Sequence, residues 1–261
     1  GTEIRDSMDF MDQEMTGTMD LRIRVEGDIK DPDILRKMDS LQLFVENNNK
    51  ITVTYSIADV VKQMHRTVMD DSLKYESIPQ SREKVNNLFT MYSMSGDPDD
   101  FSAMIDYDYT VGLITALSTV MTTEEVFSFV VSVSNYITTY FNENLNINVT
   151  GMIVVIRDMV IMIIQSSSLS ILFSLILIGI IASIFFKRIL WGFLAVVPLT
   201  AAVILNFGLM GHFNVTLNHI TAILSSIIIG VGVDFAIHFI SQFRRLSQTA
   251  HEDQLSLEVI K

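Results

Sequence analysis

An aspartate and a histidine are spaced one helical turn apart in an otherwise apolar stretch near the end of the sequence. Asp234 and His238 belong to residues 229–238, which read IGVGVDFAIH. An aspartate in a membrane-spanning helix costs roughly 2.5–3.5 kcal/mol on insertion scales, so its presence there indicates a function. A low-dielectric surrounding favours the neutral, protonated carboxyl, so such a group could take up and release a proton.

Small residues precede this pair at the same helical spacing. Counting back one turn at a time from Asp234 gives Gly230 and Ser226. Gly232 lies between Gly230 and Asp234. Such a stripe lets a helix pack closely against others while one ionisable group faces an internal, partly hydrated path. We therefore predict a proton relay of Asp234 and His238, with Ser226, Gly230 and Gly232 packing around it. Two alternatives remain open: a structural aspartate that caps a neighbouring helix or pairs with a lysine, and a histidine that meets water.

The elements that would position this pair follow from the distribution of charge. Residues 1–164 hold 13 Lys and Arg against 26 Asp and Glu, whereas residues 165–261 hold 5 against 4. The first part is typical of an acidic soluble domain and the second of a membrane segment. Nucleic acid is excluded as a partner, because phosphate binding needs clustered Lys and Arg. With no cysteine in the chain, disulfides, thiolate metal sites and cysteine nucleophiles are also excluded.

Uncharged runs predict three transmembrane helices, at about residues 159–186, 189–211 and 217–241. The first run is longer than the ~30 Å of bilayer hydrocarbon, so that helix is expected to start outside the membrane. Within it, Gly179 and Ser183 form a small-residue pair of the kind that brings helices together.

Two basic pairs orient these helices. Lys187-Arg188 separates the first span from the second, and Arg244-Arg245 closes the third, so both pairs lie on one side of the membrane. By the positive-inside tendency that side is the cytoplasm. We expect a multi-pass protein of the inner (cytoplasmic) membrane, with a periplasmic or extracellular domain over 1–157, spans within 158–243 and a cytoplasmic segment over 244–261. Because an external domain must be translocated, the chain is expected to be a fragment whose preceding transmembrane helix is missing.

The acidic domain reads as two strand-helix-strand units. Alternation predicts strands at residues 18–26, 51–55, 105–120 and 147–150, with Leu21, Ile23 and Val25 on one face. Helical spacing and start signals predict helices over residues 31–47, 56–69, 81–92 and 122–141. The expected fold is therefore α+β, a split βαβ or ferredoxin-like sandwich, followed by an all-α bundle of three transmembrane helices.

Other residues give weaker signals. Met8, Met11, Met15 and Met19 recur at helical spacing and are interpreted as a helix face packing on its domain, or as a loose, lipid-adapted surface. The aspartates between residues 97 and 108 lack the spaced ligands of a calcium loop, so a solvated turn is expected. Neither a dinucleotide-binding glycine motif nor a GxxxxGK[ST] loop occurs. We therefore predict that the chain is not an enzyme and has no metal and no cofactor, with a proton gradient as its energy source.

Several motifs resemble one family. Residues 230–239, followed by Arg244-Arg245, resemble the G(I/V)GVD(Y/F)AIH signature of the resistance-nodulation-division superfamily, in its MMPL, lipid-exporting branch with a sterol-sensing-like membrane part. Residues 185–188 are similar to its cytoplasmic turn, and residues 206–211 with Leu217-Asn218 to the end of its third span. Segments 56–60, 77–79 and 92–97 look like the porter domain of its second repeat.

The resemblance implies a proton-motive-force-driven exporter of lipids or other hydrophobic compounds. It places the proton-carrying role on Asp234 and, by motif position, a relay role on His238. Its implied partners are membrane lipids, a hydrophobic substrate, the transmembrane helices absent from this chain, and further copies in a homo-oligomer. A membrane-bound lipid sensor or scaffold, with the acidic domain binding a partner, is the competing function. That function predicts that substitution of Asp234 leaves ligand binding intact.

Overall fold

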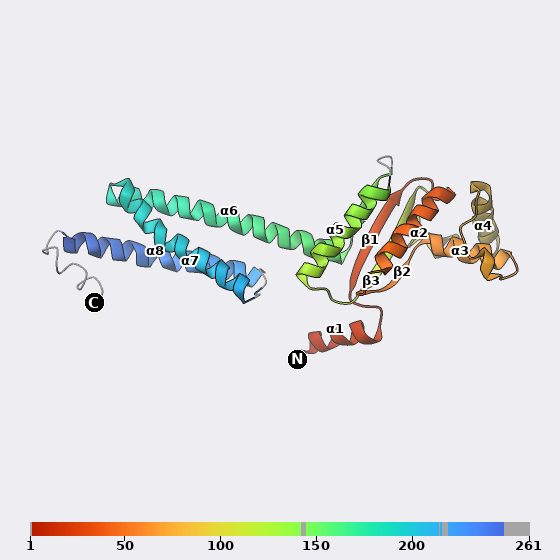
Figure 1. The fold of residues 1–261 in the computed structure, drawn as a ribbon, viewed down its shortest axis with the longest axis horizontal. Coiled ribbons are helices and arrows are strands. Elements are labelled where there is room, and N and C mark those ends of the chain that lie inside the picture. The colour runs from red at the N-terminus through yellow and green to blue at the C-terminus, as the bar shows by residue number, and fades with distance from the viewer. Residues whose placement is uncertain (1, 142–144, 214, 216–218, 248–261) are drawn as a thin grey trace. The chain divides into compact units, whose positions relative to one another are not determined.

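The structure is a computed structural model that describes residues 2–141, 145–213, 215 and 219–247 (Figure 1). The chain divides into two compact units, Gly1–Arg157 and Asp158–Lys261. The first unit is a mixed α+β structure, as the sequence predicts, and the second consists of long helices.

One antiparallel sheet forms the centre of the first unit. Its four strands are β1 (Met19–Glu26), β2 (Ile51–Tyr55), β3 (Val111–Ser118) and β4 (Ile147–Thr150). Their order is β2-β3-β1-β4, with β1 paired to both β3 and β4. Two strand-helix-strand units, β1-α2-β2 and β3-α5-β4, are thus interleaved in a single sheet, which is the split βαβ connectivity.

Two helices lie side by side over one face of this sheet, α2 (Pro32–Glu46) and α5 (Thr123–Tyr140) (Figure 1). Both start where the sequence predicts. The Asp31 side chain accepts a hydrogen bond from the Asp33 backbone N–H at 2.9 Å, and proline occupies the first helical turn. Thr122 and Glu125 form the predicted capping box, each side chain accepting a backbone N–H of the other residue.

The core lies between the sheet and these helices. As the alternation predicts, Leu21, Ile23 and Val25 all point into it and are almost completely buried. The helices contribute residues at helical spacing, namely Leu35, Met38, Leu41 and Val45 from α2 and Val126, Phe129, Val130 and Val133 from α5. Residues at every second position of the strand and at helical spacing in the two helices therefore form one apolar layer.

The third strand is shorter than expected, and the prediction of strand from residue 105 is wrong. The Asp106 carboxylate accepts hydrogen bonds from the backbone N–H groups of Thr110 and Val111, both at 2.7 Å, and from the Thr110 hydroxyl at 2.6 Å. Tyr109 adopts a left-handed φ of 58°. An aspartate that bonds nearby backbone in this way favours a turn over a ladder, so β3 begins only at Val111.

The second strand carries a bulge that the alternating pattern conceals. Ile51 pairs with Ser118, but Val53 pairs with Leu117, so the register shifts between them. Because paired residues share a face and Ser118 and Leu117 are neighbours in β3, Ile51 and Val53 lie on opposite faces. The alternation thus predicts the strand over residues 51–55 correctly but does not reveal the bulge.

The methionines near the N-terminus do not pack as one helix face. Helix α1 (Glu3–Glu14) ends before Met15, whose side chain is 56% exposed, and Met11 is 38% exposed. Met19 belongs to β1 and is buried in the core. The side chain of Met8 lies outside the described residues. The predicted packing against the domain is thus wrong for Met11 and Met15, and the alternative of a lipid-adapted surface stays a prediction.

Two further helices and two short 3-10 turns connect β2 to β3. They are α3 (Ile57–Val68), η1 (Leu73–Tyr75), α4 (Arg82–Ser95) and η2 (Pro98–Phe101). Helix α3 starts with a capping box of Ser56 and Asp59. Helix α4 continues about one turn beyond the predicted end at Tyr92 and stops at Gly96.

Three long helices follow β4. They are α6 (Met152–Phe186), α7 (Ile189–His212) and α8 (His219–Ser247). Helix α6 starts just after Gly151, which has a φ of +105° and packs against the Asp20 backbone, where a Cβ would collide. Among the described residues, α6 and α7 are long and apolar enough to cross a membrane. That α8 is a third span stays a prediction.

Helices α6 and α7 approach closely at small residues. A Cβ on Gly192 would overlap the Ser183 hydroxyl and would lie 2.5 Å from the Gly179 carbonyl oxygen. Ser183 satisfies its hydroxyl by donating to the same Gly179 carbonyl at 2.7 Å. The predicted role of Gly179 and Ser183 as a packing pair is confirmed, and Gly192 is the residue that α7 places against them.

Candidate functional site

Among the described residues, α8 contacts α7 through a single helix face. Ala236 and Ile240 are 8% and 4% exposed, and a Cβ on Gly232 would lie 2.6 Å from the Leu199 side chain of α7. These three residues are spaced four apart and form a single line along α8. Gly232 therefore acts as a helix-packing residue, and the partner it contacts is α7.

The predicted relay residues lie on another face of α8. Asp234 and His238 are two positions away from the α7-contacting line, which on a helix of 3.6 residues per turn is about 200° around the axis. Both side chains are exposed, and a Cβ on Gly230 would meet nothing within 4 Å. The Ser226 side chain lies outside the described residues. The structure thus groups Gly230, Asp234 and His238 on one open face and separates Gly232 from them.

An apolar cavity of about 550 Å³ lies between α7 and α8. Its lining is Leu194, Pro198, Leu199, Ala202, Gly232, Phe235, Ala236, Phe239 and Ile240. Pro198, which lies inside α7, and Gly232, where α8 packs against Leu199, both line this cavity. The cavity can hold an apolar group, but neither relay residue lines it.

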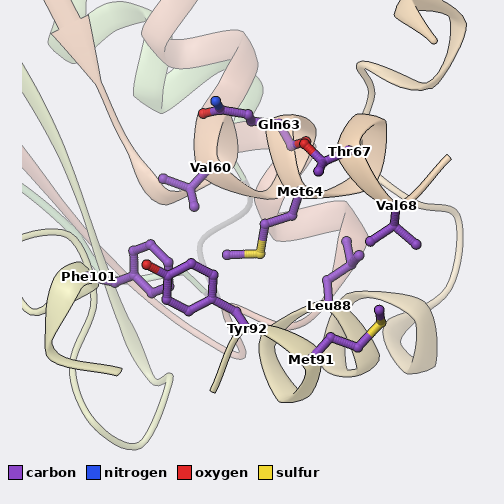
Figure 2. Close-up of a pocket in the computed structure, with 9 residues that line it drawn as sticks. All are labelled: Val60, Gln63, Met64, Thr67, Val68, Leu88, Met91, Tyr92 and Phe101. Atoms are coloured by element: carbon purple, nitrogen blue, oxygen red, sulfur yellow. The ribbon is translucent and has the colours of Figure 1, made fainter. Parts of the chain in front are cut away.

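A second cavity, of about 480 Å³, lies in the first unit between α3, α4 and η2 (Figure 2). We call it the α3–α4 cavity. Its lining residues are Val60, Gln63, Met64, Thr67 and Val68 of α3, Leu88, Met91 and Tyr92 of α4, and Phe101 of η2. Its volume falls within the ~300–1,000 Å³ of small-molecule sites, and most of the lining is aliphatic, aromatic or thioether. Methionine is unbranched and polarisable, so two of them let such a cavity adapt to different ligands.

The polar groups of the α3–α4 cavity are few. Gln63 and Thr67 contribute an amide and a hydroxyl from α3 (Figure 2). The Tyr92 hydroxyl donates to the Asp100 carboxylate at 2.5 Å, and this hydrogen bond raises the pKa of Tyr92 above its ordinary value of 10.0. A tilted ring contact at 4.6 Å between centroids packs Tyr92 against Phe101. The arrangement suits an apolar ligand with one polar end.

A buried polar network fixes the start of α3 against α2. Gln42, which is 4% exposed, accepts from the Ser56 hydroxyl at 2.6 Å and donates to the Asp59 carboxylate at 2.6 Å. Lys62 then reaches Asp59 at 2.9 Å and Asp39 at 2.7 Å. Burial alone would lower the pKa of Lys62, but its two carboxylate partners outweigh that effect and raise it. The wall of the α3–α4 cavity is thereby anchored to the core.

Sequence reasoning did not find the α3–α4 cavity. The sequence does contain a signal for it. Ile57 and Val61 of α3 are buried in the core. A second, mainly apolar line on the same helix also recurs at helical spacing, formed by Val60, Met64, Thr67 and Val68. The sequence pattern does not show that α4 lies opposite that line.

Comparison with known proteins identifies the family. No curated protein is significantly similar to this chain. The sequence model of the MMPL family matches residues 30–257, which cover most of the first unit and all three long helices. Because the match extends over far more than half of the sequence, the chain belongs to the MMPL family, a family of membrane transporters in the resistance-nodulation-division superfamily.

Proposed function

We propose that this protein is part of a proton-driven exporter of lipids or other hydrophobic compounds, situated in the cytoplasmic membrane. Family membership points to a transporter of hydrophobic compounds and fits the prediction that the chain is not an enzyme. The observation that carries the proton-driven part is the open face of α8. There a carboxylate and an imidazole occupy an apolar helix and are not used to pack against α7.

The open face needs partners before it can work in a bilayer. An exposed aspartate facing lipid would be costly, so in this proposal further transmembrane helices of the full-length protein cover Gly230 and Asp234. Those helices would leave a narrow hydrated path to the carboxylate. Protonation then removes the charge and changes which helix packing is favoured, which is a two-state element that a proton gradient can bias.

The first unit is the porter-like part in this proposal. It lies outside the cytoplasm, consistent with the basic pairs at residues 187–188 and 244–245 on the opposite side of the predicted spans. Its α3–α4 cavity offers an apolar site for cargo. Only Gly151 separates β4 from the start of α6 in the sequence.

Transport by the full-length protein in sealed membrane vesicles with an imposed pH gradient tests the proposal. Asp234→Asn keeps the shape of the side chain and removes the titratable group. We expect gradient-dependent movement of a hydrophobic substrate to fall to the level of empty vesicles, with unchanged insertion. Asp108→Asn, at an exposed position in the first unit, removes one charge as a matched control and is expected to transport normally.

The outcomes separate the candidate functions. Normal transport by Asp234→Asn would show that this aspartate is structural and that the proton mechanism is wrong. A wild-type protein that binds hydrophobic ligand but moves none of it under any gradient would instead favour the lipid sensor or scaffold, which needs the cavity and not the relay.

A further inference from the structure

The charges around the α3–α4 cavity are unevenly balanced. Residues 57–101, which include all of its lining, hold eight Asp and Glu against five Lys and Arg. Both basic residues in the middle of α3 are already shared between two carboxylates. Lys62 contacts Asp39 and Asp59, as described above, and Arg66 contacts Asp71 at 2.8 Å and Glu76 at 3.2 Å. Neither cation is therefore available to an acidic ligand.

The opposite rim of the cavity is acidic. Turn η2 carries Asp99 and Asp100 directly before the lining residue Phe101, with Asp97 at its N-cap. The ion pairs among the described residues include none of these three aspartates. Asp100 is held at the cavity by Tyr92, whose hydroxyl oxygen is 2.5 Å from its carboxylate. One end of an apolar cavity is thus flanked by the carboxylates of η2, and the hydrogen bond from Tyr92 holds that of Asp100 in place.

We propose that the α3–α4 cavity binds single-chain cationic amphiphiles, with the hydrocarbon chain along the Met64 and Leu88 side and the cationic head beside Asp100. This inference rests on the proposed transport function and names the charge class of its cargo. An alkyl chain suits the lining, and the two methionines accommodate chains of different length. A cationic head gains the attraction of Asp100, whereas an anionic head is repelled by it and finds Lys62 and Arg66 occupied.

Photolabelling tests this charge preference at the site itself. The full-length protein in neutral phosphatidylcholine nanodiscs, without a pH gradient, is labelled by three probes that share one alkyl chain bearing a diazirine at its end. Their heads are trimethylammonium, sulfate and maltoside, and mass spectrometry of the peptides locates the label. We expect the trimethylammonium probe to label α3 and α4 about fivefold more than the maltoside probe, and the sulfate probe to label them least. A single charge at contact distance in water is worth about that factor.

Variants separate the head from the chain. Asp100→Asn is expected to remove most of the preference for the cationic probe while the maltoside probe still labels both helices. Met91→Trp, at a half-exposed lining position, is expected to reduce labelling by all three probes. Asp108→Asn serves as the charge-matched control and is expected to behave as the wild type.

Three results would overturn the inference: equal labelling of α3 and α4 by the cationic and anionic probes, a preference that survives in Asp100→Asn, or label found only in α6, α7 and α8. The inference would also be overturned if a zwitterionic lysophosphatidylcholine of the same chain length competed for the cavity more strongly than the trimethylammonium amphiphile. A phosphate would then be accepted beside Asp100. Since no proton gradient enters this experiment, it can fail while proton-driven transport holds, and the reverse.

Discussion

Gly192 of α7 lies so close to Ser183 of α6 that a side chain at position 192 would overlap the serine hydroxyl. The glycine is therefore required by the approach of the two helices. Gly192→Ala should separate them or force a backbone shift, because the neighbouring Gly179 carbonyl, 2.5 Å from the added Cβ, cannot rotate away. Overpacking of this kind costs about 1–3 kcal/mol. We expect a lower unfolding temperature in detergent for Gly192→Ala.

The same helix provides the control for this substitution. A Cβ at Gly208 or at Gly211 would meet nothing within 4 Å, so alanine at either position should be neutral or slightly stabilising. Adding Ser183→Gly to Gly192→Ala should recover part of the loss, since it removes the hydroxyl but leaves the carbonyl. Equal unfolding temperatures for Gly192→Ala and Gly208→Ala would contradict the close approach of α6 and α7.

Gln42 is expected to be a stability residue whose loss also affects the α3–α4 cavity. Gln42→Ala leaves the Ser56 hydroxyl, which is completely buried, without its acceptor, and takes a donor from Asp59. An unsatisfied buried polar group costs about 1–3 kcal/mol. Thermal unfolding followed by circular dichroism should show that loss, and amide hydrogen exchange should rise at the first turn of α3. The exposed Gln80→Ala is the control, and the network would be unimportant if both variants unfolded alike.

Acid should weaken the turn before β3 through Asp106. Burial acts to raise the pKa of Asp106, but the hydrogen bonds from Thr110 and Val111 outweigh it and hold the pKa below its ordinary value of 3.8. A carboxyl with a depressed folded-state pKa contributes stability above its unfolded-state pKa and loses it as pH falls through the folded-state value. Asp106→Asn should therefore cost about 1–2 kcal/mol at neutral pH, and the difference from wild type should shrink below about pH 4.

Unfolding by urea at several pH values measures this dependence. Asp108 is exposed and lies two residues after Asp106, so Asp108→Asn is the control. It should change the free energy of unfolding by less than about 0.5 kcal/mol at every pH, the usual range for surface substitutions. A wild-type advantage over Asp106→Asn that stays constant from pH 7 to pH 3 would show that the turn is held by the shape of the side chain and not by its charge.

Much of the fold follows from local sequence signals, because caps and periodicity act over a few residues. The capping box of Thr122 and Glu125 and the Asp31 cap place the starts of α5 and α2 correctly. Where the sequence reasoning failed, a side chain bonds to backbone or the register shifts. Asp106 accepts hydrogen bonds from the backbone of Thr110 and Val111 and so forms a turn where strand was expected. The bulge after Ile51 cannot be seen in an alternating pattern.

The candidate site was less predictable for a different reason. The spacing of Asp234 and His238 on one helix face follows from the sequence alone, and so does the small size of Gly232. Which side of α8 packs against α7 depends on long-range contacts that no local pattern encodes, and the structure places Gly232, not Asp234, on that side. The α3–α4 cavity likewise requires two helices that are separated by residues 69–81 to face each other.

The most direct measurement of proton coupling is proton movement driven by substrate. In proteoliposomes of the full-length protein, with no initial pH difference and a gradient of a hydrophobic substrate, a pH-sensitive dye inside the vesicles reports protons carried in exchange. Because coupling between two ligands is reciprocal, the account predicts substrate-dependent proton flux for the wild type and none for Asp234→Asn. Undiminished proton flux in Asp234→Asn, or wild-type substrate movement without protons, would contradict it.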